Sequence, residues 1–249
     1  MKIKRRNGST HAGFTLVEVL VVVTIIIILA GILIPAVYMG LGAANDARIV
    51  VELSNIDAAF RQYKTITHGT AYPPSDMSDV NVIANHIRQK YGRYNHTTAT
   101  APPTGLDNAE VLVFWLQGYG PDPLDPLAAG TRQKLFDFDE TRLVDVDSDG
   151  HQEYYPRGGL SVPYVYFHHD QYAAPATFTG TGTGTVHPYK RDDGTFVNSD
   201  SYQLVSAGQD GDWGAAGTDK RFPSGLNYTP GDRDNITNYS EGTLEDQIP

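Results

Sequence analysis

The chain has 249 residues, with 19 Lys and Arg residues against 29 Asp and Glu residues and a net charge of −10. This acidic balance argues against nucleic acid as the main partner, because a phosphate backbone attracts basic surfaces. Cysteine is absent, which excludes disulfides, thiolate metal sites and a cysteine nucleophile. A domain that lacks disulfides in an oxidising compartment needs other stabilisation, and a divalent cation is one candidate.

Charge is distributed unevenly at the N-terminus. No acidic residue precedes Gly13, and no charged residue at all lies between Val19 and Met39, a run of 21 residues. About 20 apolar residues in a helix cross a hydrocarbon core, so this run predicts a transmembrane helix. The basic flank predicts an N-in, C-out orientation. It consists of Lys2, Lys4, Arg5 and Arg6.

A carboxylate, Glu18, opens this apolar run five residues after Gly13 and four after Phe14. The arrangement of basic leader, Gly13-Phe14 step and Glu18 resembles the class III signal of type IV pilins and type II secretion pseudopilins. The resemblance implies that a membrane peptidase cuts after Gly13 and methylates the new amino group on Phe14. Pro35 would then be residue 22 of the mature chain, where pilins commonly carry a helix-kinking proline. Loss of the leader would take Lys and Arg from 19 to 15, against 29 acids.

Two simpler interpretations of the N-terminus explain less. An uncleaved signal anchor accounts for the basic flank and the apolar length, but for neither Glu18 nor the Gly13-Phe14 step. A cleaved secretory signal peptide would have its cleavage site after the apolar region, where no convincing small-x-small site occurs.

A role for Glu18 follows from the resemblance. In a filament these helices pack in a core without water, where an unpaired carboxylate costs several kcal/mol or takes up a proton. The amino group of Phe14 on a neighbouring subunit can neutralise it. Such a pair fixes the axial register between subunits more than it adds stability, because buried ion pairs barely recover their desolvation cost.

The helix is expected to continue beyond the membrane, from about Thr15 to Thr65. Its second half is amphipathic, with one apolar stripe at spacings of four and three residues. Pro35, Gly40 and Gly42 are expected to bend or loosen it. The stripe consists of Ile49, Leu53, Ile56, Phe60 and Tyr63.

The predicted organisation is a leader at 1–13, a transmembrane and assembly helix at 14–39, its amphipathic continuation at 40–66 and a globular domain at 67–249. The expected fold class is α+β, with the long helix packed on a loop-rich antiparallel β-sheet domain of pilin-like architecture. Further helices are predicted at 79–91, with Val82 facing inward, and at 107–116. Strands are predicted at 135–138, 141–146, 164–168 and 202–206, and an exposed Thr/Gly loop at 179–185.

Two Asp- and Gly-rich loops, 206–214 and 231–238, follow the last predicted strand. They look like the C-terminal calcium loop of the major pseudopilin of type II secretion systems, whose turn is matched by Ser206, Gly208, Asp210 and Gly211. The resemblance implies bound Ca²⁺ and leaves open which acidic residue closes the site; the alternative is a pair of solvated turns. The candidate ligands are the Leu204 carbonyl, Asp210, Asp232, Asp234 and Asn235.

A second candidate calcium loop places Asp145, Asp147 and Asp149 at alternate positions before a glycine, as at the start of an EF-hand. It then departs from that pattern, because Pro156 occupies the position of the bidentate acid. Glu153 is a candidate late ligand. The alternative is an acidic β-turn.

Three common catalytic motifs are absent from the sequence, and although carboxylates far apart in the chain could meet to hydrolyse glycosides, nothing singles out such a pair. There is no Gly-x-Ser-x-Gly, no Gly-x-x-x-x-Gly-Lys and no His-Glu-x-x-His, so we expect the protein not to be an enzyme. His168 and His169 end a predicted strand, where neighbouring side chains point to opposite faces, so they are not expected to share a metal.

The sequence therefore predicts a structural subunit, cleaved and N-methylated by a prepilin peptidase, that polymerises through its N-terminal helix. The filament would be a type II secretion pseudopilus or a type IV pilus-like fibre. The expected partners are the prepilin peptidase, other pilin or pseudopilin subunits, the inner-membrane assembly platform and membrane lipid, with the domain in the periplasm or outside the cell. The alternative is a membrane-anchored, calcium-dependent binding or hydrolytic domain with an uncleaved pilin-like anchor. Filament type, and major or minor subunit, stay open.

Overall fold

The computed structural model describes residues 15–67, 71–130, 132–158, 161–173, 184–215 and 219–249. The leader, Gly13 and Phe14 lie outside these residues, as does most of the predicted Thr/Gly loop. The chain divides into two compact units, Met1–Ala43 and Ala44–Pro249.

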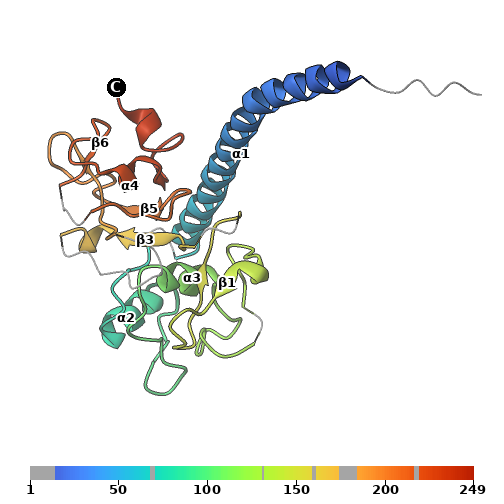
Figure 1. Ribbon diagram of the computed structural model, residues 1–249. Coiled ribbons are helices and arrows are strands. Elements are labelled where there is room, and N and C mark those ends of the chain that lie inside the picture. The colour runs from blue at the N-terminus through green and yellow to red at the C-terminus, as the bar shows by residue number, and fades with distance from the viewer. Residues whose placement is uncertain (1–14, 68–70, 131, 159–160, 174–183, 216–218) are drawn as a thin grey trace, which may run out of the picture. The chain divides into compact units, whose positions relative to one another are not determined.

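Figure 1 labels the main elements in chain order. The helices are α1 Leu16–Ile66, α2 Val80–Lys90, α3 Glu110–Leu116 and α4 Pro230–Arg233, with short 3₁₀ turns η1 Glu140–Arg142, η2 His169–Gln171 and η3 Glu245–Gln247. The strands are β1 Leu143–Val144, β2 Glu153–Tyr154, β3 Val165–His168, β4 Lys190–Arg191, β5 Tyr202–Ser206, β6 Arg221–Phe222 and β7 Ile236–Thr237.

The first unit contains the apolar half of α1. Every large apolar side chain from Leu16 to Leu41 is exposed, so this half is apolar on all sides. The helix is long and apolar enough to cross a membrane, by length and composition. It runs from Leu16 to Ile66 without interruption, within one residue of the predicted bounds at each end.

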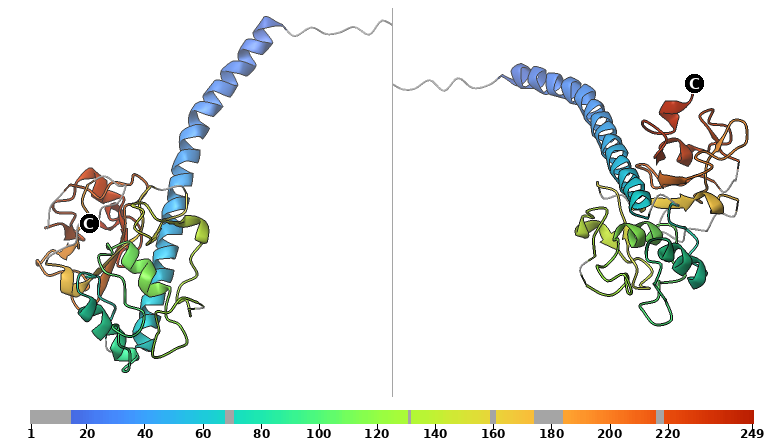
Figure 2. Two further views of the ribbon diagram at one scale, coloured as in Figure 1. Left: turned by 90° about the horizontal axis from the view of Figure 1, so that it is seen from below. Right: turned by 180° about the vertical axis from the view of Figure 1, so that it is seen from behind.

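The second half of α1 belongs to the globular unit. The predicted stripe is confirmed, because its five side chains are each at most 1% exposed and all belong to the main core cluster. Burying each of them contributes about 1.5–3 kcal/mol. The last turns of α1 lie beside α3 in all three views (Figures 1 and 2). This half of the helix is therefore a structural element of the domain.

Helices α2 and α3 pack into the same core. Asp79 caps α2, since its Oδ1 accepts a hydrogen bond from the Asn81 amide at 2.8 Å. Ile83 and Ile87 are buried, whereas Val82 is 50% exposed. The inward orientation predicted for Val82 is wrong, because it lies one position off the i, i+4 face that these two residues define. All seven residues of α3 are buried.

The central sheet has the order β3-β5-β7 and is antiparallel. Tyr166 pairs with Leu204 in it. Side chains of β3 and β5 alternate between two core clusters, so both strands are buried on both faces. One cluster receives Tyr166 and Leu204, and the other receives Val165, Phe167 and Val205.

The remaining strands are pairs of two-residue segments. β1 and β2 are antiparallel, whereas β4 and β6, which were not predicted as strands, are parallel. The strand predicted at 202–206 has the same bounds as β5. Of the strand predicted at 141–146, only the two residues of β1 form a strand. No strand forms at 135–138. Phe136 and Phe138 there pack edge-on against Tyr154 instead, so their apolar character reflects core packing.

Candidate functional site

The start of α1 is held by a reciprocal pair of residues. The Thr15 amide and hydroxyl both donate to Oε2 of Glu18 at 2.9 Å, and the Glu18 amide donates to the Thr15 hydroxyl at 3.2 Å. This is a capping box, which satisfies two N-terminal amide groups that have no partner within the helix. The pattern Thr-x-x-Glu was present in the sequence, so Glu18 has a local structural role besides any role in assembly.

Pro35 lies in the interior of α1. Because proline has no amide hydrogen, the carbonyl of Gly31 one turn earlier loses its helical donor. A side chain at Gly31 would meet nothing within 4 Å, so the structure shows no packing reason for glycine there.

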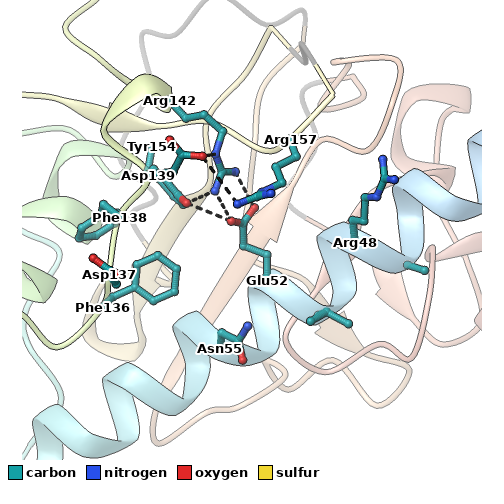
Figure 3. A pocket seen from close by; sticks show the side chains of 12 residues that line it. Arg48, Glu52, Asn55, Phe136, Asp137, Phe138, Asp139, Arg142, Tyr154 and Arg157 are labelled. Atoms are coloured by element: carbon teal, nitrogen blue, oxygen red, sulfur yellow. Dashed lines mark hydrogen bonds and ion pairs between the residues drawn. The ribbon is translucent and has the colours of Figure 1, made fainter.

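An open groove of about 810 Å³ lies along the second half of α1 (Figure 3). At its centre Arg142 forms a two-point contact with Glu52, from Nη1 to Oε2 at 2.8 Å and from Nη2 to Oε1 at 2.5 Å. Tyr154 and Tyr164 donate to the same carboxylate at 3.0 and 2.7 Å. Burial opposes ionisation, but Arg142 and the hydroxyls outweigh it and lower the pKa of Glu52. The network fixes α1 to the chain around β1 and β2.

The predicted C-terminal ligands lie close together in the fold but differ in their partners. Asp232 is fully buried, and its carboxylate contacts the ammonium group of Lys220, which is 2% exposed. Tyr189 donates to the same carboxylate at 3.2 Å, and the Thr229 amide and hydroxyl donate at 2.8 Å. The charge of Asp232 is thus balanced by a cationic side chain. Lys220 and Tyr189 were not predicted, because neither belongs to a recognisable motif.

Asp210 and Asp234 form a second part of these loops. The amides of Gln209 and Asp210 donate to Oδ2 of Asp234 at 2.8 and 3.0 Å, while its Oδ1 is buried without a hydrogen-bond partner. Burial and the neighbouring Asp210 carboxylate raise the pKa of Asp234 to about 6. Gly208 has a φ of +63° and a Cβ there would lie 2.2 Å from the Asp234 carbonyl, so this turn requires glycine.

The other two C-terminal candidates lie in the interior. The Leu204 carbonyl accepts from the Asn238 amide at 3.2 Å. Asn235 is fully buried and donates to the Tyr189 hydroxyl at 2.9 Å, and its Oδ1 is buried without a partner. Calcium binding by these loops stays a prediction.

The loop between β1 and β2 carries the second predicted site. The carboxylates of its three aspartates accept hydrogen bonds from backbone amides within the loop, as in an acidic turn. Asp145 accepts from Gly150 at 3.1 Å, Asp147 from Asp149 at 3.3 Å, and Asp149 from His151 at 2.8 Å.

Three acids from other segments join this loop. Glu110 from α3 and Glu153 from β2 are each 3% exposed, and Asp107 caps the amides of Ala109 and Glu110. Burial and the surrounding carboxylates raise the pKa of Glu110 to about 8 and that of Glu153 to about 7. We call this set the central acidic cluster; it comprises Asp107, Glu110, Asp145, Asp147, Asp149 and Glu153.

Within the described part of the chain, two sets of three potential metal ligands have donor atoms within 4.8 Å of one another. One is Glu110 with Asp147 and Asp149, and the other is His168 with His169 and Asp170. The prediction that the two histidines point apart is wrong, because their ring centroids lie 4.3 Å apart. The strand ends at His168 and a 3₁₀ turn begins at His169, so strand alternation does not apply.

Comparison with known proteins identifies the N-terminal segment. A family model described as the prokaryotic N-terminal methylation motif matches residues 8–34. This segment is a prepilin-type signal. It is the signature of type IV pilins and pseudopilins. No curated protein and no solved structure matches the chain.

The prepilin-type signal explains the features gathered at the start of α1. It contains Gly13, Phe14 and Glu18, and it ends one residue before Pro35. It implies processing by a prepilin peptidase and assembly with other pilin subunits. Together with the apolar helix it indicates membrane anchoring by a single N-terminal helix.

Proposed function

We propose that this protein is a structural subunit that polymerises through the apolar half of α1 into a type II secretion pseudopilus or a type IV pilus-like filament. The observation that carries the proposal is Glu18, a carboxylate inside a prepilin-type signal and at the start of a helix that is apolar on all sides. Lipid covers that helix before assembly, and neighbouring helices cover it afterwards. In this account the domain contributes no catalysis.

The proposed role of Glu18 is to set the axial register. After cleavage, the amino group of Phe14 on one subunit faces the carboxylate of Glu18 on the next, and any other register leaves two charges uncompensated in a water-free core. The capping box gives Glu18 partners in the single chain, but these are neutral groups that leave its charge available.

The acidic domain after the span and the basic leader before it support an N-in, C-out orientation, with the domain in the periplasm or in an extracellular filament. The C-terminal loops resemble those of the major pseudopilin, which favours secretion machinery over an adhesive pilus. We propose Ca²⁺ as the ligand of those loops, through Asp210, Asp234 and Asn235. Two of these residues carry buried oxygen atoms without a hydrogen-bond partner.

Two substitutions separate the charge of Glu18 from its capping role. Glu18→Gln removes the charge but keeps an acceptor for Thr15, and Thr15→Ala removes the cap but keeps the charge. Filament yield, membrane insertion and leader cleavage would be measured in the same cells.

Glu18→Gln is expected to insert and to be cleaved normally but to assemble at least about tenfold less, because an uncompensated partner charge costs about 3 kcal/mol or more. Thr15→Ala is expected to have the smaller effect, about 1 kcal/mol. Normal filament yield from Glu18→Gln would contradict the register role.

A further inference from the structure

The loop between β1 and β2 follows the spacing of an EF-hand for its first nine positions. Acids occupy positions one, three and five, glycine occupies position six, and Glu153 occupies position nine. The acid that an EF-hand needs at position twelve is replaced by Pro156, which cannot act as a carboxylate ligand. On sequence spacing alone the cation shell is incomplete.

The fold brings a carboxylate from another element to this incomplete loop. Glu110, at the first position of α3, has a carboxylate oxygen within 4.8 Å of one oxygen of Asp147 and one of Asp149. Glu110 is 3% exposed because α3 is enclosed by the domain core. A buried, well-positioned acid thus stands beside the two exposed acids of the loop.

Two oxygen atoms of the cluster lack the partners that buried oxygen requires. Oε1 of Glu110 and Oδ1 of Asp145 are both buried and have no hydrogen-bond partner. Among the described residues, no Lys, Arg or His forms an ion pair with any of the six acids. A buried carboxylate that has neither a counter-charge nor a full set of donors is strongly disfavoured, so it either takes up a proton or is neutralised by a bound cation.

We propose that the central acidic cluster is a divalent cation site for calcium, in which Glu110 supplies the ligand that the loop itself lacks. Asp147 and Asp149 complete the inner set, and Asp145 in the same loop and Glu153 at the start of β2 add further oxygens. The donor set consists of oxygen atoms only and is drawn from the loop between β1 and β2, from α3 and from β2. This suits calcium, which takes six to eight oxygens in variable geometry, better than magnesium, which demands a near-ideal octahedron.

Such a site has a structural consequence. The cation would join the exposed loop between β1 and β2 to α3, and through α3 to the main core. The proposal is independent of the filament function, because it concerns only the globular unit.

Calcium titration of the full-length protein in detergent, after removal of metal with a chelator, tests the site. Isothermal titration with CaCl₂ would be run on the wild type and on Glu110→Gln. Asp147→Asn is a second variant on the exposed loop, where folding is not at risk. Glu241→Gln is the matched control, an exposed glutamate outside the cluster. Asp234→Asn reports on the C-terminal loops.

Glu110→Gln and Asp147→Asn are each expected to weaken calcium binding at least about tenfold, because affinity in such sites depends on the number of charged ligands. Glu241→Gln is expected to bind as the wild type does, and excess Mg²⁺ is expected not to displace calcium. The proposal is overturned if the wild type takes up no calcium at about 5 mM, above the weakest extracellular sites. It is equally overturned if Asp234→Asn removes all binding while Glu110→Gln and Asp147→Asn retain it.

Discussion

Removing the carboxylate of Glu52 should destabilise the globular unit more than the loss of an ordinary surface charge would. Glu52 lies on the second half of α1 and accepts four hydrogen bonds, two from Arg142 and one each from Tyr154 and Tyr164. The side chains of Glu52 and Arg142 are only 14% and 13% exposed. Glu52→Ala would therefore leave a largely buried guanidinium without its closest counter-charge, with Asp139 3.4 Å from Nε of Arg142 as the remaining acid, and two hydroxyls without this acceptor.

The expected cost follows from these contacts. Breaking a buried ion pair by removing one partner costs about 3–5 kcal/mol, because the remaining charge stays desolvated. Solvent at the open side of the groove and the remaining ion pair between Arg142 and Asp139 both reduce that penalty, so we take about 3 kcal/mol as the expected loss in free energy of unfolding. In a domain of this size each kcal/mol lowers Tm by about 2–4 °C, which predicts a fall of roughly 6–12 °C.

Thermal unfolding of the full-length protein in detergent, followed by circular dichroism, measures this loss. Glu140→Ala is the matched control, because Glu140 is exposed and lies 3.8 Å from Lys134; its Tm should change by no more than about 1–2 °C. The double variant Glu52→Leu/Arg142→Met should recover part of the loss, since it leaves no unpaired charge. A Tm for Glu52→Ala within 2 °C of the wild type would refute the assignment of this network as the attachment of α1.

Two further predictions concern pH and calcium. Burial lowers the pKa of His86 to about 4, so this side chain binds fewer protons in the folded chain than in the unfolded chain between that value and the unperturbed 6.5; its contribution to stability should therefore fall as pH drops from 7 to 5, and the difference in Tm between the wild type and His86→Gln should shrink over that range. An equal slope in the variant would exclude His86 as the cause. In a Glu110→Gln background, chelation should still lower Tm through the C-terminal loops, and Asp210→Ala should abolish that sensitivity; identical melting with and without chelator in this background would remove the C-terminal site.

The long helix could be predicted from sequence because two strong signals specify it. Apolar composition determines its first half, and the period of the stripe from Ile49 to Tyr63 determines its second half. The strand at 202–206 could also be predicted, because its five residues are enough to show the alternating pattern and the residue types that favour strands. The two-residue strands β4 and β6 were not, because such short segments carry no period and are positioned by contacts remote in sequence.

The candidate sites likewise divide into residues that spacing along the chain identifies and residues that only the fold identifies. Gly13, Phe14 and Glu18 were predicted because their spacing along the chain is itself the pattern of the N-terminal methylation motif. Glu110 and Lys220 were missed because their roles depend on which segments the fold brings together. In the sequence Glu110 looks like an ordinary acid at a helix start, and only the placement of α3 beside the loop at 145–150 makes it a candidate ligand.

The central claim is that the chain is processed as a prepilin and assembled as a filament subunit. The intact mass and the N-terminal residue of the protein, extracted from its native membrane, test this most directly. The account predicts a mature chain that begins at N-methylated Phe14 and lacks residues 1–13. A chain that still begins at Met1 would contradict it and would favour a static, membrane-anchored binding or hydrolytic domain.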